Sequence, residues 1–280
     1  MERAYQYLVN LDPDLFLAII LGLLFFLEQF FSDVNPFPKR ASHLLNSIFL
    51  QAGYFLVNLG LALGVVSCLN WIEHDKIGLF YHIQIPYWFK VILGVIVIDF
   101  INYWEHRLNH IWGIFWRLHR VHHSDTTMDS STSYRFHPLD ALLDNSASIV
   151  AAILFGLDGA ILALWLILYI PLLVLHHSNY IMPKWFDMTF GKIIVSPNFH
   201  KIHHHQDREY TDSNYGLMFI FWDKIFKTYK RLPVKDIKFG LKEFDEPGRQ
   251  KLWFLLKSPL LDLNKTVNRQ NDIENVASKM

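Results

Sequence analysis

The stretch Asp99-Phe-Ile-Asn-Tyr-Trp-Glu-His-Arg-Leu-Asn-His110 ends a long apolar run with two histidines four residues apart. Residues spaced by three or four lie on one face of a helix, so this stretch predicts a helix that presents both imidazoles to the same side. Asp99 lies on the same stripe, seven residues before His106. We therefore expect Asp99 to accept a hydrogen bond from the free ring N–H of a metal-bound histidine.

Two further histidine clusters repeat this arrangement. They read His119-Arg-Val-His122-His123 and His200-Lys-Ile-His203-His204. Neutral imidazole is the commonest metal ligand in proteins. A solvated histidine-rich surface is the alternative, but three clusters of this spacing in one chain favour a metal centre. Because one ion cannot use so many ligands, the sequence predicts a site with more than one metal.

Other histidines carry weaker signals. His137, in Phe136-His-Pro-Leu-Asp140, and His177, in His176-His-Ser-Asn179, are the best additional ligand candidates. Asp140 is a second carboxylate that could orient a ligand ring. We expect the remaining histidines to be structural or bystanders: His43, His74, His82, His176 and His205.

The apolar residues are gathered into four runs, in a chain that is 52% hydrophobic and only 19% charged. A membrane-spanning helix needs about 20 mainly apolar residues. A soluble protein with very hydrophobic core helices is the alternative, but four such runs leave too little polar surface for it. The runs are Leu15–Leu27, Leu44–Ile72, Ile85 to about Trp104, and Ser146–Leu175.

The fourth run is too long for one straight span. As a single helix it would extend about 45 Å, against about 30 Å of hydrocarbon. Gly156-Leu-Asp-Gly159 is a turn signal within it. We therefore predict a helical hairpin, about Leu142–Phe155 entering the membrane and Ala160–His176 returning, which brings His177 back to the other clusters.

The predicted fold is an all-α integral membrane protein: a transmembrane helix bundle with a re-entrant or short helical hairpin, capped by a cytoplasmic helical, histidine-rich metal domain. Positive loop charge sets orientation. Lys39 and Arg40 follow the first run, and Arg107, Arg117, Arg120 and Arg135 follow the third. We expect both segments on the cytoplasmic side of a bacterial inner membrane or the endoplasmic reticulum. The expected domains are 1–91 (membrane helices), 92–231 (di-metal domain) and 232–280 (cytoplasmic or interfacial tail).

Composition excludes several classes of protein. Lys+Arg and Asp+Glu are equal at 26 each, so the basic excess of a nucleic-acid binder is absent. The single cysteine, Cys68, excludes a disulfide framework, a cysteine zinc site and a cysteine-ligated iron–sulfur cluster. No G-x-G-x-x-G or C-x-x-C occurs, so a redox enzyme of this sequence needs an external electron donor. The candidate docking cations are Arg117, Arg120, Lys201 and Arg208, although they could equally be solubilising charges.

Taken in order, the histidine motifs resemble the fatty acid hydroxylase / sterol desaturase superfamily. Asp99-x3-Tyr103-Trp-x-His106-Arg resembles its entry to the first cluster, and Asn214-Tyr-Gly216 with Trp222-Asp-Lys-Ile-Phe-Lys-Thr228 resembles its closing motifs. Lys227 stands where glycine is common. The likeness covers about residues 92–229, and it extends to the alkylglycerol monooxygenase and bacterial sterol-desaturase-like branches at least as much as to the sterol enzymes.

The resemblance implies a membrane di-iron oxygenase that uses O2, with zinc a possible substitute in purified protein. It implies a lipid substrate and an external electron donor such as a b-type cytochrome, a ferredoxin or a similar reductase chain. Hydroxylation and desaturation share this oxidant, and we expect hydroxylation. Two other classes stay open: a zinc-dependent membrane hydrolase or lyase, and a non-catalytic metal-binding or transport protein. The implied ligands are His106, His110, His119, His122, His123, His200, His203 and His204, with His137 and His177 as additions.

Overall fold

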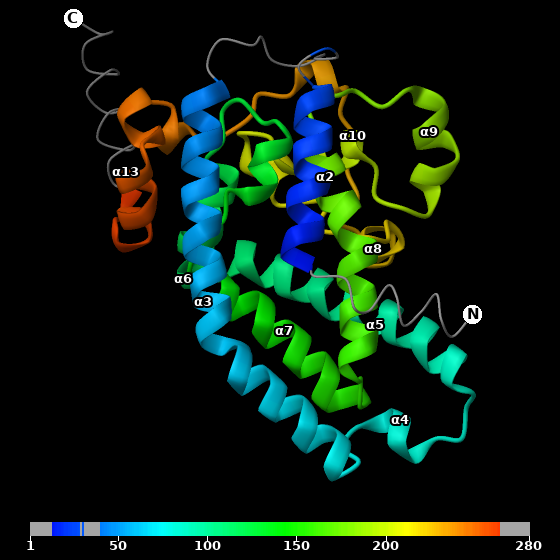
Figure 1. The fold of residues 1–280 in the computed structure, drawn as a ribbon. Coiled ribbons are helices and arrows are strands. Elements are labelled where there is room, and N and C mark those ends of the chain that lie inside the picture. The colour runs from blue at the N-terminus through cyan, green and yellow to red at the C-terminus, as the bar shows by residue number, and fades with distance from the viewer. Residues whose placement is uncertain (1–12, 29, 31–39, 264–280) are drawn as a thin grey trace, which may run out of the picture.

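The computed structural model describes residues 13–28, 30 and 40–263, and this part of the chain is helical without a β-strand. Figure 1 shows how the helices are arranged. The longer helices are α2 (Pro13–Leu27), α3 (Arg40–His74), α5 (Tyr87–Ile111), α6 (Gly113–His123), α7 (Asp140–Phe155) and α8 (Gly159–His177). The shorter ones are α4 (Leu79–His82), α9 (Lys184–Met188), α10 (Pro197–His203), α11 (Arg208–Thr211), α12 (Phe221–Ile225) and α13 (Leu252–Lys257), with 3-10 turns that include η2 (Ser130–Tyr134).

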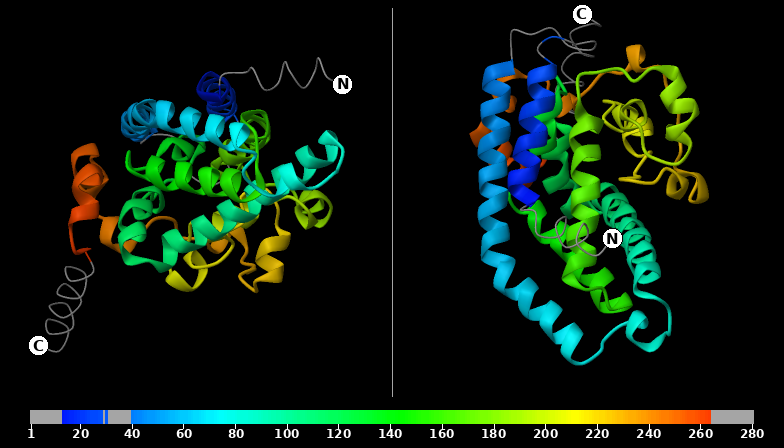
Figure 2. Two further views of the ribbon diagram at one scale, coloured as in Figure 1. Left: turned by 90° about the horizontal axis from the view of Figure 1, so that it is seen from below. Right: turned by 45° about the vertical axis from the view of Figure 1, so that its right-hand side comes forward.

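Three helical segments within the described residues are long and apolar enough to cross a membrane: His43–His82, Tyr87–Ile111 and Gly159–His177. Leu15–Leu27 forms a shorter apolar helix, α2, which packs against α8. The two views of Figure 2 show α2 and α8 side by side, with the upper part of α3 beside α2. These helices confirm the prediction of an all-α membrane protein. Of the residues used to predict orientation, Lys39 lies outside the described part and Arg40 begins α3, so the cytoplasmic placement stays a prediction.

The fourth apolar run folds as the predicted hairpin. Helix α7 ends at Gly156, whose φ of 70° is the left-handed conformation that glycine adopts without strain. Asp158 then caps α8 by accepting a hydrogen bond from the backbone N–H of Ile161 at 2.9 Å, and a second from the Tyr87 hydroxyl at 2.9 Å. Gly156 also touches the loop after α3: a Cβ atom on Gly78 would lie 2.0 Å from its backbone nitrogen. The turn is therefore fixed to its neighbours, and α8 runs back towards the histidine clusters.

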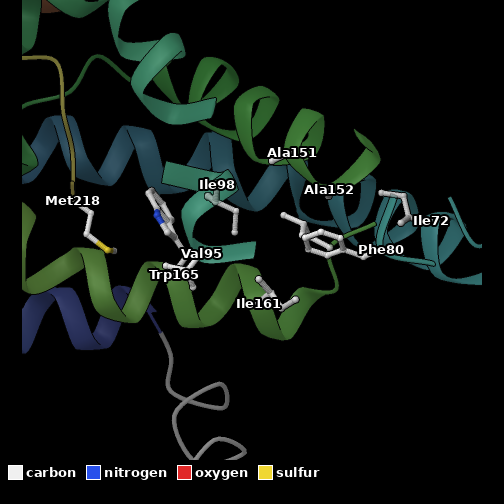
Figure 3. Packing of buried hydrophobic residues seen from close by; sticks show 10 residues of the cluster. Ile72, Phe80, Val95, Ile98, Ala151, Ala152, Ile161, Trp165 and Met218 are labelled. Carbon is white, nitrogen blue, oxygen red and sulfur yellow. The ribbon is translucent and has the colours of Figure 1, made fainter. Parts of the chain in front are cut away.

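The hydrophobic core lies where α5, α7 and α8 meet. Ile98 of α5, Ala151 of α7 and Trp165 of α8 belong to one buried cluster, which extends to Phe80 of α4 (Figure 3). Small side chains on α7 let it pack closely against both α3 and α5. This packing fixes the relative positions of the helices that carry the first histidine cluster and His177.

The described part of the C-terminal segment packs on the helical body. Leu255 of α13 is fully buried in a cluster with Leu50 of α3 and Val121 of α6, whereas Trp253 is 74% exposed. The segment therefore covers the outer side of α6, next to the histidines that α6 carries. Residues 264–280 lie outside the described part.

Candidate metal centre

Nine buried histidines form two adjacent groups. Within each group, one ring nitrogen from every member lies within 4.8 Å of those of the others. The rings of His123 and His204, one from each group, stack with centroids 4.4 Å apart, so the groups lie side by side. Group A consists of His106, His110, His119, His123 and His203, and group B of His122, His177, His200 and His204.

Helical periodicity explains the division. In α6, His119 and His123 are four residues apart and both belong to group A, while His122 is turned towards group B. Helix α10 and its C-cap do the reverse: His200 and His204 belong to group B, and His203 to group A. Each H-x-x-H-H motif thus serves both groups, with the i and i+4 imidazoles facing one and the i+3 imidazole the other.

Three acceptors in one short segment orient the rings of group A. The Nδ1 atom of His106 lies 2.8 Å from the carbonyl oxygen of Tyr215, and that of His203 lies 2.7 Å from the carbonyl oxygen of Ser213. The Nδ1 atom of His110 lies 3.2 Å from a carboxylate oxygen of Asp212. Carbonyl and carboxylate oxygens only accept hydrogen bonds, so each Nδ1 atom carries the proton. Each Nε2 atom is then unprotonated and has a free lone pair.

The resulting ring tautomers point unprotonated nitrogens at one another. The Nε2 atoms of His106 and His203 lie 3.0 Å apart although neither has a proton to share. In group B, Nδ1 of His177 donates to the carbonyl of Leu173, and its Nε2 lies 3.1 Å from that of His122. Metal–imidazole bonds are about 2.0–2.1 Å long, so two nitrogens at right angles around one ion lie about 3 Å apart. The spacing fits a metal ion between the rings.

Unpartnered ring nitrogens give the same result. Buried polar atoms in proteins are nearly always hydrogen-bonded, yet both nitrogens of His123 are buried without a partner. So are Nε2 of His110 and His119 in group A. In group B the unpartnered atoms are Nδ1 of His122, His200 and His204, which face away from the converging Nε2 atoms. Burial, reinforced by the neighbouring imidazoles, holds the pKa of His203 and His204 well below the ordinary value. The rings are therefore neutral, as metal ligands must be, and the donor set fits two metal ions.

Asp99 does not bond a clustered histidine, as the sequence predicts, but the segment that orients one. Its carboxylate accepts hydrogen bonds from the backbone N–H groups of Met218 and Phe219 at 3.0 and 3.2 Å, and from the Trp222 indole at 2.9 Å. None of these partners is a ligand ring. The reason is that residues 218–222 pack against the stripe of α5 that carries Asp99. Asp99 therefore fixes the segment whose Tyr215 carbonyl orients His106.

Asp223 has the corresponding role at the other side of this segment. It accepts from the backbone N–H groups of Tyr215 and Gly216, each at 2.8 Å, and from the Thr228 hydroxyl at 2.6 Å. Asn214 adopts a φ of 56° and bonds the carbonyls of Phe199 and Lys230. The Asn-Tyr-Gly and Trp-Asp motifs thus build the loop that orients group A. Sequence reasoning gave no role to Asp212 or to Asp223, although Asp223 lies in the Trp-Asp motif and in α12. Neither carboxylate has a spacing relative to the histidines that marks it.

His137 and Asp140 lie outside both groups. The Nε2 atom of His137 lies 3.1 Å from the Leu256 carbonyl, and its Nδ1 accepts from the Leu139 backbone N–H at 3.2 Å. Both ring nitrogens are therefore used in holding the chain before α7. Asp140 accepts from the backbone N–H of His137 at 3.1 Å and not from a ligand ring. The structure thus brings together nine of the ten histidines that the sequence nominates, and not His137.

The remaining histidines are also outside the groups. His176 is buried with Nε2 2.9 Å from the Val195 carbonyl, and His205 accepts from the Asp207 backbone N–H at 2.9 Å. His43 is buried and bonds Asp125 at 2.7 Å. It lies within α3, away from both groups.

Four basic side chains are predicted to form a docking surface for an electron donor, and two of them are not at the surface. Arg120 is 3% exposed and donates to the carbonyls of Ser258 and Leu261, and Lys201 is 1% exposed. That part of the docking prediction is wrong, because α6 and α10 turn these side chains into the protein. Arg208 is half exposed, stacks on the Trp116 ring and pairs with Asp212, and Arg117 is exposed.

A cavity of about 340 Å³ borders the histidines of both groups. His106 and His119 of group A line it together with His122, His177 and His200 of group B. Its other walls come from α2, α3, α5, α7 and α8. A molecule in this cavity would lie directly against both candidate metal positions.

The chain matches the model of the family described as fatty acid hydroxylase over residues 91–228. That range begins in α5 and ends after α12, so it contains all nine clustered histidines and the loop that orients them. The chain belongs to the fatty acid hydroxylase / sterol desaturase superfamily. This confirms the resemblance seen in the motifs, and it makes the protein a lipid-modifying oxidoreductase.

The curated relatives carry several activities. Methylsterol monooxygenase 2-2 of Arabidopsis thaliana is 29% identical over 83% of this chain and 94% of its own length. Very-long-chain aldehyde decarbonylase GL1-11 of Oryza sativa subsp. indica is 33% identical over 59% of this chain and 63% of its own. Delta(7)-sterol 5(6)-desaturase erg3B of Aspergillus fumigatus is 33% identical over 48% of this chain and 37% of its own. No solved structure matches the chain.

Proposed function

We propose that this protein is a membrane-bound di-iron oxygenase that hydroxylates a C–H bond of a lipid, with O2 and two electrons supplied from outside the chain. The observation that carries the proposal is the pair of histidine groups bordering one cavity between membrane-type helices. Imidazole suits iron, zinc and copper alike. The relatives named as a monooxygenase and a desaturase favour iron and oxygen chemistry over a zinc hydrolase or a transport protein.

The reaction balances as one lipid C–H bond, one O2, two electrons and two protons giving one hydroxylated lipid and one water. When bound, the two iron ions supply the activation of O2 and the oxidation of the C–H bond, which protein side chains cannot do. Groups A and B would hold one ion each, through the Nε2 atoms that converge in each group.

The chain itself supplies orientation and exclusion of water. The carbonyls of Tyr215 and Ser213 fix the rings of His106 and His203, so the ligands are preorganised. Leu173 and Ile170 of α8 line the cavity with the histidines, and they place apolar surface next to the oxidising centre. A lipid held there displaces water that would otherwise quench the oxidant.

The test uses full-length protein purified without chelator and reconstituted in lipid with a reducing system. We expect O2 consumption that depends on added lipid and on iron, with an oxygen atom from ¹⁸O2 incorporated into the product. A new double bond with no incorporated oxygen would assign desaturation instead. Zinc-loaded protein that consumes no O2 in any lipid mixture, and that stays inactive after replacement of zinc by iron, would refute the proposal.

A further inference from the structure

The cavity beside the histidines has two chemically different walls. Helices α2 and α8 contribute apolar residues such as Leu17, Leu166 and Ile170. The side chains that α3 and α7 contribute are polar, and so are the non-ligand side chains from α5. Those used below are Tyr54 of α3, Glu105 and Asn109 of α5, and Asp144 of α7. Beside a ligand made only of hydrocarbon these polar groups would be unfavourable, because buried polar groups cost free energy unless they are paired.

Two carboxylates with spare acceptor capacity stand in this polar wall. Asp144 accepts from the Tyr54 hydroxyl at 2.5 Å, and Glu105 accepts from the side-chain amide of Asn109. A carboxyl group offers several hydrogen-bonding positions, and among the described residues one side-chain donor serves each. No lysine or arginine of the described residues lines the cavity. The wall therefore presents carboxyl oxygens that no cationic side chain of the lining engages.

Two further atoms in the cavity lining lack partners. The indole Nε1 of Trp165 and the amide Oδ1 of Asn109 are buried without a hydrogen bond, and these residues are only 5% and 3% exposed. Both atoms are closed to solvent, so the contacts to a ligand are assigned to the two carboxyl groups. Asn109 is also the donor to Glu105, so it belongs to the same hydrogen-bonded part of the lining.

From these contacts we infer that the cavity binds an amphiphile whose head carries a hydrogen-bond donor, an alcohol or an amine, held by Glu105 and Asp144 while its hydrocarbon lies against α2 and α8. The inference rests on the proposed function, since it places this head beside the candidate metal centre. It goes beyond that function by naming the substrate class and the residues that select it. A cavity of about 340 Å³ is at the lower end of ligand-pocket sizes, enough for the head and the first part of a chain.

The test measures binding and needs no turnover. Metal-loaded protein in lipid nanodiscs is titrated with decanol, decylamine and decyl methyl ether, and each Kd is referred to the probe concentration in the bilayer. The ether has the same chain but no donor. We expect decanol, decylamine or both to bind on the order of tenfold tighter than the ether, the size expected for one hydrogen bond. A preference for the alcohol would identify a neutral head, and a preference for the amine an ammonium head.

Matched variants locate the preference. Glu105→Gln/Asp144→Asn keeps the shape of both side chains and should remove the preference for donors while leaving the ether unchanged. Glu209→Gln, at an exposed carboxylate outside the cavity, should keep it. Leu166→Ala should weaken all three probes alike. Unchanged metal content in each variant shows that the fold is intact. An ether that binds as tightly as both donors, or a preference that survives in the double variant, would overturn the inference, whether or not the protein proves to be an oxygenase.

Discussion

The Nε2 atoms of His106 and His203 lie 3.0 Å apart, and neither carries a proton, because each ring donates its Nδ1–H to a backbone carbonyl of the loop 213–215. Two lone pairs held face to face in a buried site repel one another unless a cation lies between them. The fold thus maintains an arrangement that is unfavourable without metal. The same loop supports His110 through Asp212, so group A is oriented at three of its five rings.

Group A should hold its metal more tightly than group B. Among the ring nitrogens of group B that do not converge, only Nδ1 of His177 has a hydrogen-bond acceptor, whereas those of His122, His200 and His204 have none. Since such outer partners account for about 10–100-fold in metal affinity, chelator titration should remove metal in two steps. Elemental analysis should find one metal for each of the two histidine groups before chelation, and His204→Gln should retain the tighter one. Simultaneous loss of both metals from the wild-type protein would contradict this asymmetry.

Single replacement of a clustered histidine should abolish turnover without removing the protein from the membrane. His110→Ala, His123→Ala and His204→Ala each delete a ring from a group, while the apolar helices that hold the protein in the bilayer are unchanged. His137→Gln and His176→Gln are the controls, since both rings bond backbone carbonyls outside the groups. Retention of more than about a tenth of wild-type activity at a clustered position would remove that residue from the ligand set, because ligand losses cost far more.

Replacing Asp212 tests whether the orientation of the His110 ring contributes to metal affinity, because Asp212 bonds this ring without being a candidate ligand. Asp212→Ala deletes the acceptor of the His110 Nδ1–H, and the affinity of group A for metal should fall about 10–100-fold while the ligand itself stays in place. Asp207→Ala is the matched control, a nearby exposed carboxylate that pairs with Lys242 at 3.8 Å. Competition with a metal indicator measures both variants. Equal affinities in the two would show that the hydrogen bond from His110 to Asp212 contributes nothing.

Metal-free protein should lose stability as the pH falls below about 6.5. Burial lowers the pKa of six clustered histidines outside the membrane-type helices: His119, His122, His123, His200, His203 and His204. In the unfolded chain these rings take up protons near pH 6.5, whereas in the fold they stay neutral. Each ring therefore lowers the free energy of unfolding by about 1.4 kcal/mol per pH unit below that value.

The opposite contribution of Asp223 is smaller. Burial raises the pKa of this carboxyl to about 6, so in this range it offsets one proton at most. Thermal unfolding of chelated protein between pH 8 and pH 5 measures the net effect, and His123→Gln should reduce the slope. A melting temperature independent of pH would show that the rings are hydrated in the metal-free state.

Part of this site follows from sequence spacing and part does not. The i, i+3, i+4 spacing of His119, His122 and His123 predicts a shared metal centre, but not that His122 serves the other group, which depends on how α6 and α10 pack. The three acceptors for group A come from a loop, and two of them are backbone carbonyls, which leave no mark in a sequence. The residue type and motif of His137 predict a metal ligand. In the structure, however, backbone groups of Leu139 and Leu256 bond both of its ring nitrogens.

The hairpin of α7 and α8 should keep both of its ends on one side of the membrane. Gly156 and Asp158 turn the chain, and His177 reaches group B only because α8 returns. A charge in mid-bilayer costs a few kcal/mol on insertion scales, so Asp158 belongs at the far interface, where the Tyr87 hydroxyl bonds it. Asp140 and Asn179 bracket the hairpin but are buried, which makes the exposed neighbours Leu139 and Tyr180 better labelling positions.

Single cysteines at Leu139, Tyr180, Gly159 and Asp75, in a Cys68→Ser background, test this arrangement with a membrane-impermeant thiol reagent. The residues at 139 and 180 should label from the same side, which the loop charges predict to be the cytoplasmic one. Those at 159 and 75 should label from the opposite side, because Gly78 and Gly156 are in contact and hold the two far turns together. Cysteines at 139 and 180 that label from opposite sides would mean that α7 and α8 do not form a hairpin in the membrane. His177 could then not join group B, and the second metal would have to be held by His122, His200 and His204 alone.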